Sequence, residues 1–292
     1  MKPSLVRVDG ENMNECLEFL KAREHRAISL ASHLAPDGRI RPTGPGIKDC
    51  FALRGDSGGA IDGLVLLTNT GILFHCLDEG AESCAELVSR RLEPANVRCI
   101  LGAEPGTGFL EGRIDARVNR TVEYRLMTMT SCPSGNAPDD PDSGDCAVDR
   151  QGLRIRRCDA SDAPSLLSLQ EGYEREEVIP PGEPFSREAC LANLSRTLSS
   201  QFVYAAFVGQ EPAAKAGTNA RGIAWDQLGG VYTALAWRGK GLAAALVTHV
   251  VRERMAMGKK IALFVKIRNT SAIRVYEKVG FSPDIPFRIS YL

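Results

Sequence analysis

Hydrophobic and polar residues alternate along this chain with the period of a helix in some segments and of a strand in others. These segments come in a similar order in both halves. Apolar positions recur at helical spacing over residues 13–34 and 82–92. Strand patterns bounded by glycine turns occupy residues 50–53, 60–76, 97–101 and 122–127. A similar order of helices and strands follows residue 151. The pattern predicts an α+β protein with a mixed sheet, whose smaller first half is a degenerate copy of the second.

A polar segment separates the halves. Residues 131–150 are acidic and rich in proline and glycine, and such a composition cannot bury a core. We therefore predict a divergent α+β domain at residues 1–130, a flexible linker at 131–150 and a second domain at 151–292.

The second domain begins with an alternating strand at residues 153–157, followed by a helix that Asp159 or Ser161 can cap. Glu174, Glu176 and Glu177 then precede a break at Pro180-Pro181, and we interpret these charges as mostly solvated. A helix pattern at 186–198 and strand patterns at 202–208 and 223–233 follow.

The most informative stretch runs from Val231 to Ala244. A strand passes through the basic turn Arg238-Gly239-Lys240-Gly241 into an alanine-rich amphipathic helix. The first amides of a helix lack intrahelical partners and lie at the positive end of its dipole, so such a turn favours a bound phosphate. The stretch predicts a phosphorylated cofactor.

The spacing of this turn narrows the choice of cofactor. The chain lacks the phosphate loop of nucleotide hydrolases, and the turn lacks the third glycine of the dinucleotide fingerprint. Arg238-Gly239-Lys240-Gly241-Leu242-Ala243 does fit [Gln/Arg]-x-x-Gly-x-[Gly/Ala]. Residues 263–281 add a strand, an Asn-x-x-Ala-x-x-x-Tyr helix and a final Gly-Phe. Together these motifs resemble the GNAT superfamily of N-acetyltransferases over residues 151–292.

The resemblance implies the GNAT acyl-CoA N-acyltransferase fold in the second half, with acetyl-CoA or CoA as the cofactor. The backbone of Val231, Tyr232 and Thr233 would pair with pantetheine, and Asn269 would contact the cofactor's arm. The turn and helix start would hold the pyrophosphate, through Arg238, Gly239, Lys240, Gly241, Leu242, Ala243 and Ala244. Tyr276 stands where many family members deliver a proton to the leaving thiolate, although an aromatic side chain also packs well there.

The general base is not assigned. Many relatives carry a glutamate on the strand before the turn, whereas this chain has Gln227 and Gly229, and Asp226 points to the opposite face. A water chain, a glutamate before Pro180, a residue of the first domain or an amine already neutral could serve instead. Trp225, Tyr232 and Trp237 could line an acceptor pocket or pack in the core.

The first half offers less chemistry. It has no Arg-x-x-Gly-x-Ala turn, which indicates that it does not bind the cofactor. Gly55-Asp56-Ser57-Gly58-Gly59 resembles a serine protease nucleophile motif only superficially, and we interpret it as a turn. We interpret His25 and His33 as solvated or capping residues, and His249 lies mid-helix, away from the turn.

Composition excludes several function classes. The 36 basic and 36 acidic residues balance, so nothing points to a nucleic acid or a membrane partner. The sequence has no 18-residue apolar run, and its first residues lack the apolar core of a secretory signal. Nine scattered cysteines without a Cys-x-x-Cys pair predict no metal site or disulfide framework. We expect a cytoplasmic protein.

The sequence therefore predicts an acetyl-CoA-dependent N-acetyltransferase that acts on a small-molecule or peptide amine by direct attack in a ternary complex. The first domain would shape the acceptor site or mediate assembly, for example as a homodimer. Two alternatives stay open: a non-catalytic CoA-binding sensor or scaffold, and a tandem acyltransferase with a different acceptor.

Overall fold

The computed structural model describes residues 2–35, 46–56, 59–92, 96–114, 117–132, 152–180 and 182–292. Residues 133–150 of the predicted linker and Ser57 lie outside the described residues. No helix in the described part of the chain combines the length and the apolar character needed to cross a membrane.

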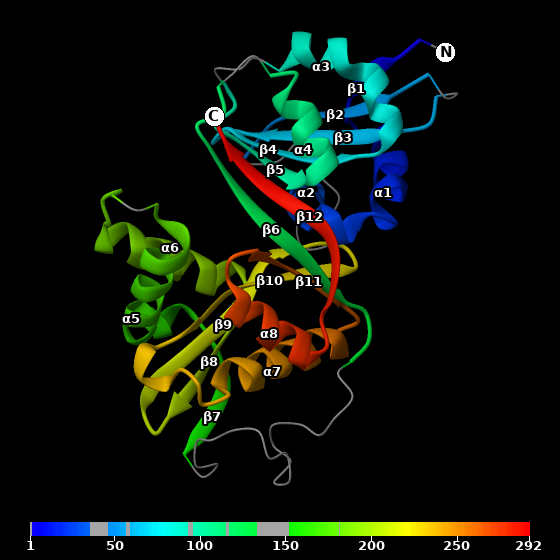
Figure 1. Cartoon of the computed structure of the whole chain (residues 1–292). Coiled ribbons are helices and arrows are strands. Elements are labelled where there is room, and N and C mark those ends of the chain that lie inside the picture. Colours follow the sequence, from blue (N-terminus) through cyan, green and yellow to red (C-terminus); the bar gives the residue numbers. More distant parts are fainter. Residues whose placement is uncertain are drawn as a thin grey trace.

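The strands of the described residues form one sheet of twelve, in the order β1-β2-β3-β4-β5-β12-β6-β11-β10-β9-β8-β7 (Figure 1). The strands of the first half are β1 (Ser4–Arg7), β2 (Ile47–Arg54), β3 (Gly63–Thr68), β4 (Ile72–Leu77), β5 (Cys99–Ala103) and β6 (Arg120–Met129). Those of the second half are β7 (Leu153–Cys158), β8 (Val203–Val208), β9 (Glu211–Arg221), β10 (Trp225–Thr233), β11 (Lys260–Lys266) and β12 (Ser282–Tyr291).

In the described part of the chain, eight α-helices cover the two faces of this sheet. The first half has α1 (Met13–Lys21), α2 (Ile28–Leu34), α3 (Ala85–Arg91) and α4 (Glu104–Glu111), and the second has α5 (Ala163–Tyr173), α6 (Arg187–Ser200), α7 (Leu242–Ala256) and α8 (Thr270–Val279). In each half the first two helices share a core with one face of the strands, and the last two share a core with the other. The halves thus have the same element order, as the sequence pattern predicts.

The last strand of each half pairs with the other half. β6 lies antiparallel to β11, and β12 lies antiparallel to β5. β6 and β12 also pair with each other, and Figure 1 shows them running together across the middle of the molecule. The site described below is therefore built from both halves.

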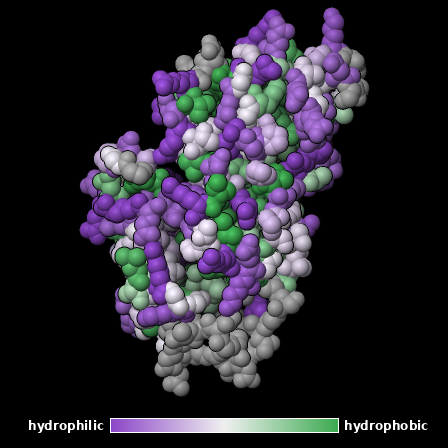
Figure 2. Space-filling view, in the orientation of Figure 1, coloured by the Kyte–Doolittle hydropathy of each residue, from purple (hydrophilic) through white to green (hydrophobic). Residues whose placement is uncertain are grey.

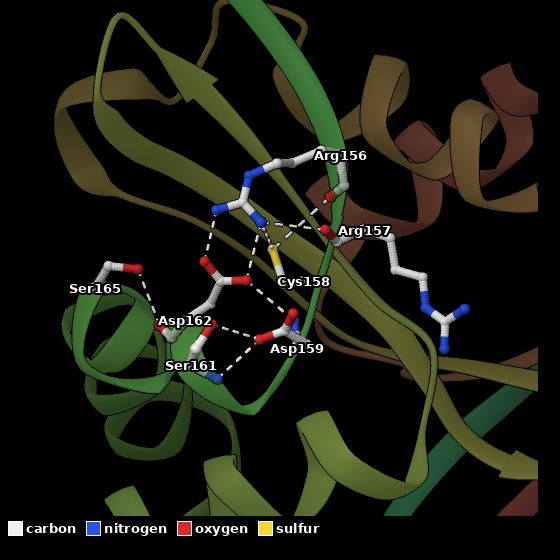
Figure 3. A network of polar contacts seen from close by, with 7 residues as sticks. All are labelled: Arg156, Arg157, Cys158, Asp159, Ser161, Asp162 and Ser165. Carbon is white, nitrogen blue, oxygen red and sulfur yellow. Dashed lines mark hydrogen bonds and ion pairs between the residues drawn. The ribbon is translucent and has the colours of Figure 1, made fainter.

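The second half begins with a local polar network at the end of β7 (Figure 3). Asp159 accepts a hydrogen bond from the Ser161 amide at 2.8 Å, and Asp162 accepts one from the Asp159 amide, which forms the predicted cap. Arg156 binds the Asp162 carboxylate at 2.5 and 2.9 Å, and this contact lowers the pKa of Asp162 to about 2. Arg157 points away from the network (Figure 3). The capped turn directs the chain from the edge strand into α5.

Two parallel strands of the first half, β4 and β5, separate after a short paired stretch, and we call the gap that opens between them a wedge. In the first half a histidine fills this wedge. β4 pairs with β5 from Ile72 to Phe74, and the next residue, His75, is 2% exposed. A Cβ on Gly102 or Gly106 would overlap its ring, so both glycines provide room for it. Thr107 donates its hydroxyl proton to the Ala103 carbonyl and therefore accepts from His75 Nε2, at 2.8 Å. His75 is consequently the neutral Nε2–H tautomer.

We expect His75 to weaken the fold in acid. Burial lowers its pKa from 6.5 to about 3, so the unfolded chain binds a proton between these values while the folded protein does not. Wild-type stability relative to His75→Leu is constant above about pH 6.5 and falls as the pH drops towards 3. Urea unfolding of both proteins between pH 7 and 4 measures this, and a constant difference would contradict it.

An ion pair on the α7 face of the sheet is fully buried. Arg254 of α7 donates to Asp226 of β10 at 2.7 Å, and the two side chains are 7% and 0% exposed. Asp226 therefore points to the face of the sheet opposite that of Gln227, whose side chain contacts Ser29 of α2, as its place in the strand predicts. Its role is structural, because its bonded partner belongs to the packed helix.

Removal of one partner of this pair leaves the other charge buried and unpaired. We expect Arg254→Met to lower the free energy of unfolding by about 3–5 kcal/mol. The double variant Asp226→Leu/Arg254→Met should recover most of that loss, since it leaves no unpaired charge. Chemical denaturation of the single and double variants gives the coupling energy, and purely additive losses would refute a coupled pair.

Candidate active site

The second half contains the same kind of wedge, but this one is open. β10 and β11 pair in parallel from Trp225↔Lys260 to Leu228↔Leu263, and no further pairs follow. A bulge interrupts β10 between Gly229 and Tyr232, and Gly230 there has φ +60°. From Gly229 to Thr233 the edge of β10 that faces β11 thus presents backbone polar groups without a strand partner.

The turn after β10 has the geometry that its glycines predict. Gly239 and Gly241 have φ of +75° and +79°, values that other residues rarely adopt. Gly241 is the N-cap of α7, so the free amides of its first turn face the end of the wedge. Arg238 begins this turn and is exposed.

A pocket of about 1000 Å³ occupies the wedge and the space in front of it. It is lined by every predicted site residue except Lys240: Val231, Tyr232, Thr233, Arg238, Gly239, Gly241, Leu242, Ala243, Ala244, Asn269 and Tyr276. The Lys240 ammonium lies 4.3 Å from the centre of the Trp237 ring. The structure therefore brings together residues that the two sequence motifs place about thirty positions apart.

Tyr276 of α8 and Asn269, the N-cap residue of that helix, line this pocket. Asn269 caps the helix by accepting from the Ala272 amide at 3.1 Å, and its own amide donates to Glu177 at 3.1 Å. Tyr276 is 8% exposed, and burial raises the pKa of its hydroxyl well above the ordinary value of 10. The hydroxyl therefore stays protonated at neutral pH and is available as a proton donor.

Glu176 and Glu177 also line the pocket, where Glu176 contacts Arg238 and Glu177 contacts Asn269. They belong to a single π-helical turn, η6 (Glu174–Val178), that continues α5. Glu176 binds Arg238 at 2.8 Å and accepts from the Tyr232 hydroxyl at 2.8 Å. Glu177 pairs with Lys266 at 3.0 Å. The expectation that these charges are mostly solvated is wrong for Glu174, which is buried, whereas Glu176 is exposed and nevertheless paired.

The electrostatics of Glu176 follow from these contacts. Burial acts to raise its pKa, but the hydrogen bonds from Arg238 and Tyr232 outweigh burial, and the pKa falls below its ordinary value. The same ion pair raises the pKa of Arg238. The Arg238 guanidinium therefore neutralises the Glu176 carboxylate of the η6 turn.

A buried lysine supports the β10 bulge. Lys215 of β9 is 4% exposed and donates to the Gly230 carbonyl at 2.9 Å. Its ammonium lies 4.6 Å from the centre of the Tyr173 ring, and burial lowers its pKa to about 8. A lysine in a strand pattern normally indicates a solvent-facing position, so the pattern does not signal this role.

The first half contributes to the inner wall of the pocket. Ser29 of α2 donates to the Gln227 side chain at 3.2 Å, and Leu101 and Tyr124 line the same space. Tyr232 and Trp237 line the pocket, whereas Trp225 packs in the core between the halves. None of the four histidines lines it, all four being described residues.

Comparisons with known proteins agree with this architecture. Residues 166–281 match the model of the acetyltransferase (GNAT) family. The second half of the chain therefore carries a GNAT acetyltransferase domain, and the family resemblance of its motifs is confirmed. A comparison with curated proteins finds no match.

Several solved structures share the fold over nearly the whole chain. A Drosophila protein has 14% identity and a TM-score of 0.67, covering 99% of this chain and 98% of its own. A tandem GNAT protein from the clavulanic acid biosynthesis pathway has 13% identity and a TM-score of 0.60, with the same two coverages. A GCN5-related N-acetyltransferase from Sphaerobacter thermophilus has 16% identity and a TM-score of 0.54, covering 99% of this chain and 95% of its own. The predicted α+β GNAT fold is confirmed.

Proposed function

We propose that this protein transfers an acetyl group from acetyl-CoA to a primary amine, by direct attack of the amine in a ternary complex. The observation that carries the proposal is one pocket in which the open β10 edge, the Arg238 turn and the Tyr276 hydroxyl meet. The family domain supports acetyl transfer in general. The amine acceptor is our inference.

The residues around the wedge suit acetyl-CoA. The free edge from Gly229 to Thr233 can pair with the pantetheine amides as an added strand would. The amides that start α7 and the Arg238 guanidinium can bind the pyrophosphate. Bound acetyl-CoA would supply the activated acyl group, as a thioester. A carboxylate, Glu176, already binds Arg238, so an anion is suited to this position.

The chain offers a proton donor and a proton acceptor in the same pocket. Tyr276 is held protonated by burial and can donate to the leaving thiolate. Of the described residues, Glu176 and Glu177 supply the carboxylates that line the pocket. Glu176 is held by Arg238 at the turn, whereas Glu177, which pairs with Lys266, lies close enough to Tyr276 to contribute to the raised pKa of its hydroxyl. We therefore assign Glu177, rather than Gln227, as the group that takes the proton from the amine.

We expect Arg238→Glu to weaken acetyl-CoA binding by about tenfold or more. The substitution replaces a charge-assisted contact to the pyrophosphate with repulsion. Arg196→Gln, on the exposed surface of α6, is the matched control and should bind as the wild type does. Isothermal calorimetry measures both. An absence of binding to the wild type would reject the cofactor assignment itself.

We expect Tyr276→Phe and Glu177→Gln to act on turnover rather than on binding. Loss of a general acid or base lowers kcat by about 10²- to 10⁴-fold. Tyr276→Phe should leave acetyl-CoA affinity near the wild-type value, because the ring still packs against Phe281. Thiol release against a pooled amine library gives kcat. Unchanged kcat in Tyr276→Phe would reduce that residue to packing, and wild-type binding without any turnover would favour the sensor function.

A further inference from the structure

A second cavity, of about 380 Å³, adjoins the main pocket, and its lining is rich in arginine. It lies between the η6 turn with its following loop and the outer ends of β6 and β12. The two cavities are adjacent and share lining residues, namely Tyr124, Glu176, Glu177, Lys266 and Arg268. In Figure 2 a recess separates the part that carries α5 and α6 from the central strands.

The sheet places this cavity in line with the inner wall of the main pocket. Alternate residues of a strand share a face, so Arg120 and Val122 lie on the same side of β6 as Tyr124. Tyr124 is the register partner of Lys266 on β11. A continuous surface therefore leads from Tyr124, inside the main pocket, to Arg120 at the outer end.

Three arginines line the second cavity, and we call it the arginine cavity. The guanidinium of Arg120 lies 4.4 Å from the centre of the Tyr291 ring, and that of Arg175 lies 3.8 Å from the centre of the Phe185 ring. Arg268 comes from the loop after β11. A guanidinium stacked on a ring keeps its N–H edge free for a planar or tetrahedral anion.

The charges of this cavity are not balanced locally. No described carboxylate forms an ion pair with Arg120, Arg175 or Arg268. Glu176 and Glu177 also line the cavity but pair with Arg238 and Lys266. Glu183 adds one further carboxylate, which leaves a positive excess on a chain with no net charge. The cavity is thus suited to an anion.

We propose that the arginine cavity binds a negatively charged group, a carboxylate or a phosphate, of the amine acceptor. The amine of such an acceptor would lie at the Tyr124 and Glu177 boundary, facing the wedge. This inference rests on the proposed acetyl transfer and adds the substrate class: amines that also carry an anionic group.

The test compares acceptors in matched pairs that differ in one charge. Amino acids are set against their carboxamides, and aminoalkyl phosphates against the corresponding amino alcohols. Thiol release gives kcat/KM for each, and calorimetry gives the binding of each to the protein alone. Variants Arg120→Gln, Arg175→Gln and their double variant remove the charge. Arg113→Gln is the control, because Arg113 also lies over an aromatic ring, that of Phe109, in the first half.

The wild type should prefer the anionic member of a pair by about tenfold to hundredfold in kcat/KM, the usual effect of charge-assisted hydrogen bonds. In the double variant this preference for the anionic acceptor should be lost, because KM for that acceptor rises. In Arg113→Gln the preference should remain. Acetyl-CoA affinity should not change, since Arg120 and Arg175 do not line the main pocket. Carboxylate and phosphate series identify which anion is bound.

Two negative results would have different meanings, one for the anion site and one for the proposed acetyl transfer. Equal use and equal binding of charged and neutral members by the wild type overturns the inference and leaves acetyl transfer intact. A wild type that binds no acetyl-CoA overturns the proposed function, while the calorimetric comparison of matched pairs still decides whether the cavity binds anions. Thermal denaturation of the single variants separates loss of binding from loss of fold.

Discussion

The site depends on the parting of two parallel strands. While β10 and β11 run side by side, each satisfies the backbone of the other, and that pairing ends at Leu228 and Leu263. Beyond this point the polar groups of β10 need another partner, because unpaired backbone is costly to bury. Lys215 holds the bulge at Gly230 from behind, and the β6–β11 pairing holds the other wall. The opening is thus maintained by packing and hydrogen bonds around it.

The two halves resolve this same constraint in opposite ways. In the first half the wedge is filled by the neutral His75 ring, and the turn after β4 carries Asp78, which pairs with Arg23. In the second half the wedge is a cavity, and the turn after β10 is basic and rich in glycine. The repeated architecture therefore provides one open site, and the other copy contributes walls such as Ser29, Leu101 and Tyr124.

Local chemistry made part of this site predictable. Arg238 to Ala244 form a turn whose conformation depends on its own glycines, so their spacing alone indicated an anion site. Lys215 was not predicted as a site residue, and Glu176 and Glu177 entered only among the open alternatives for the general base, because the roles of all three depend on partners 15 to 92 positions away in the sequence. The run of glutamates before Pro180 was the available signal for two of them. The pairing of β6 with β11 depends on the whole topology, which periodicity does not encode.

The exchange of β6 and β12 also constrains how the protein can fold. The first half cannot complete its sheet until β12, the last strand of the sequence, reaches the edge of β5. During synthesis that edge is open, and an open edge can pair with other chains. Contacts of such long sequence separation slow folding, since a large loop must close before they form. The two halves therefore acquire their final structure together, as a single cooperative unit, despite their separate cores.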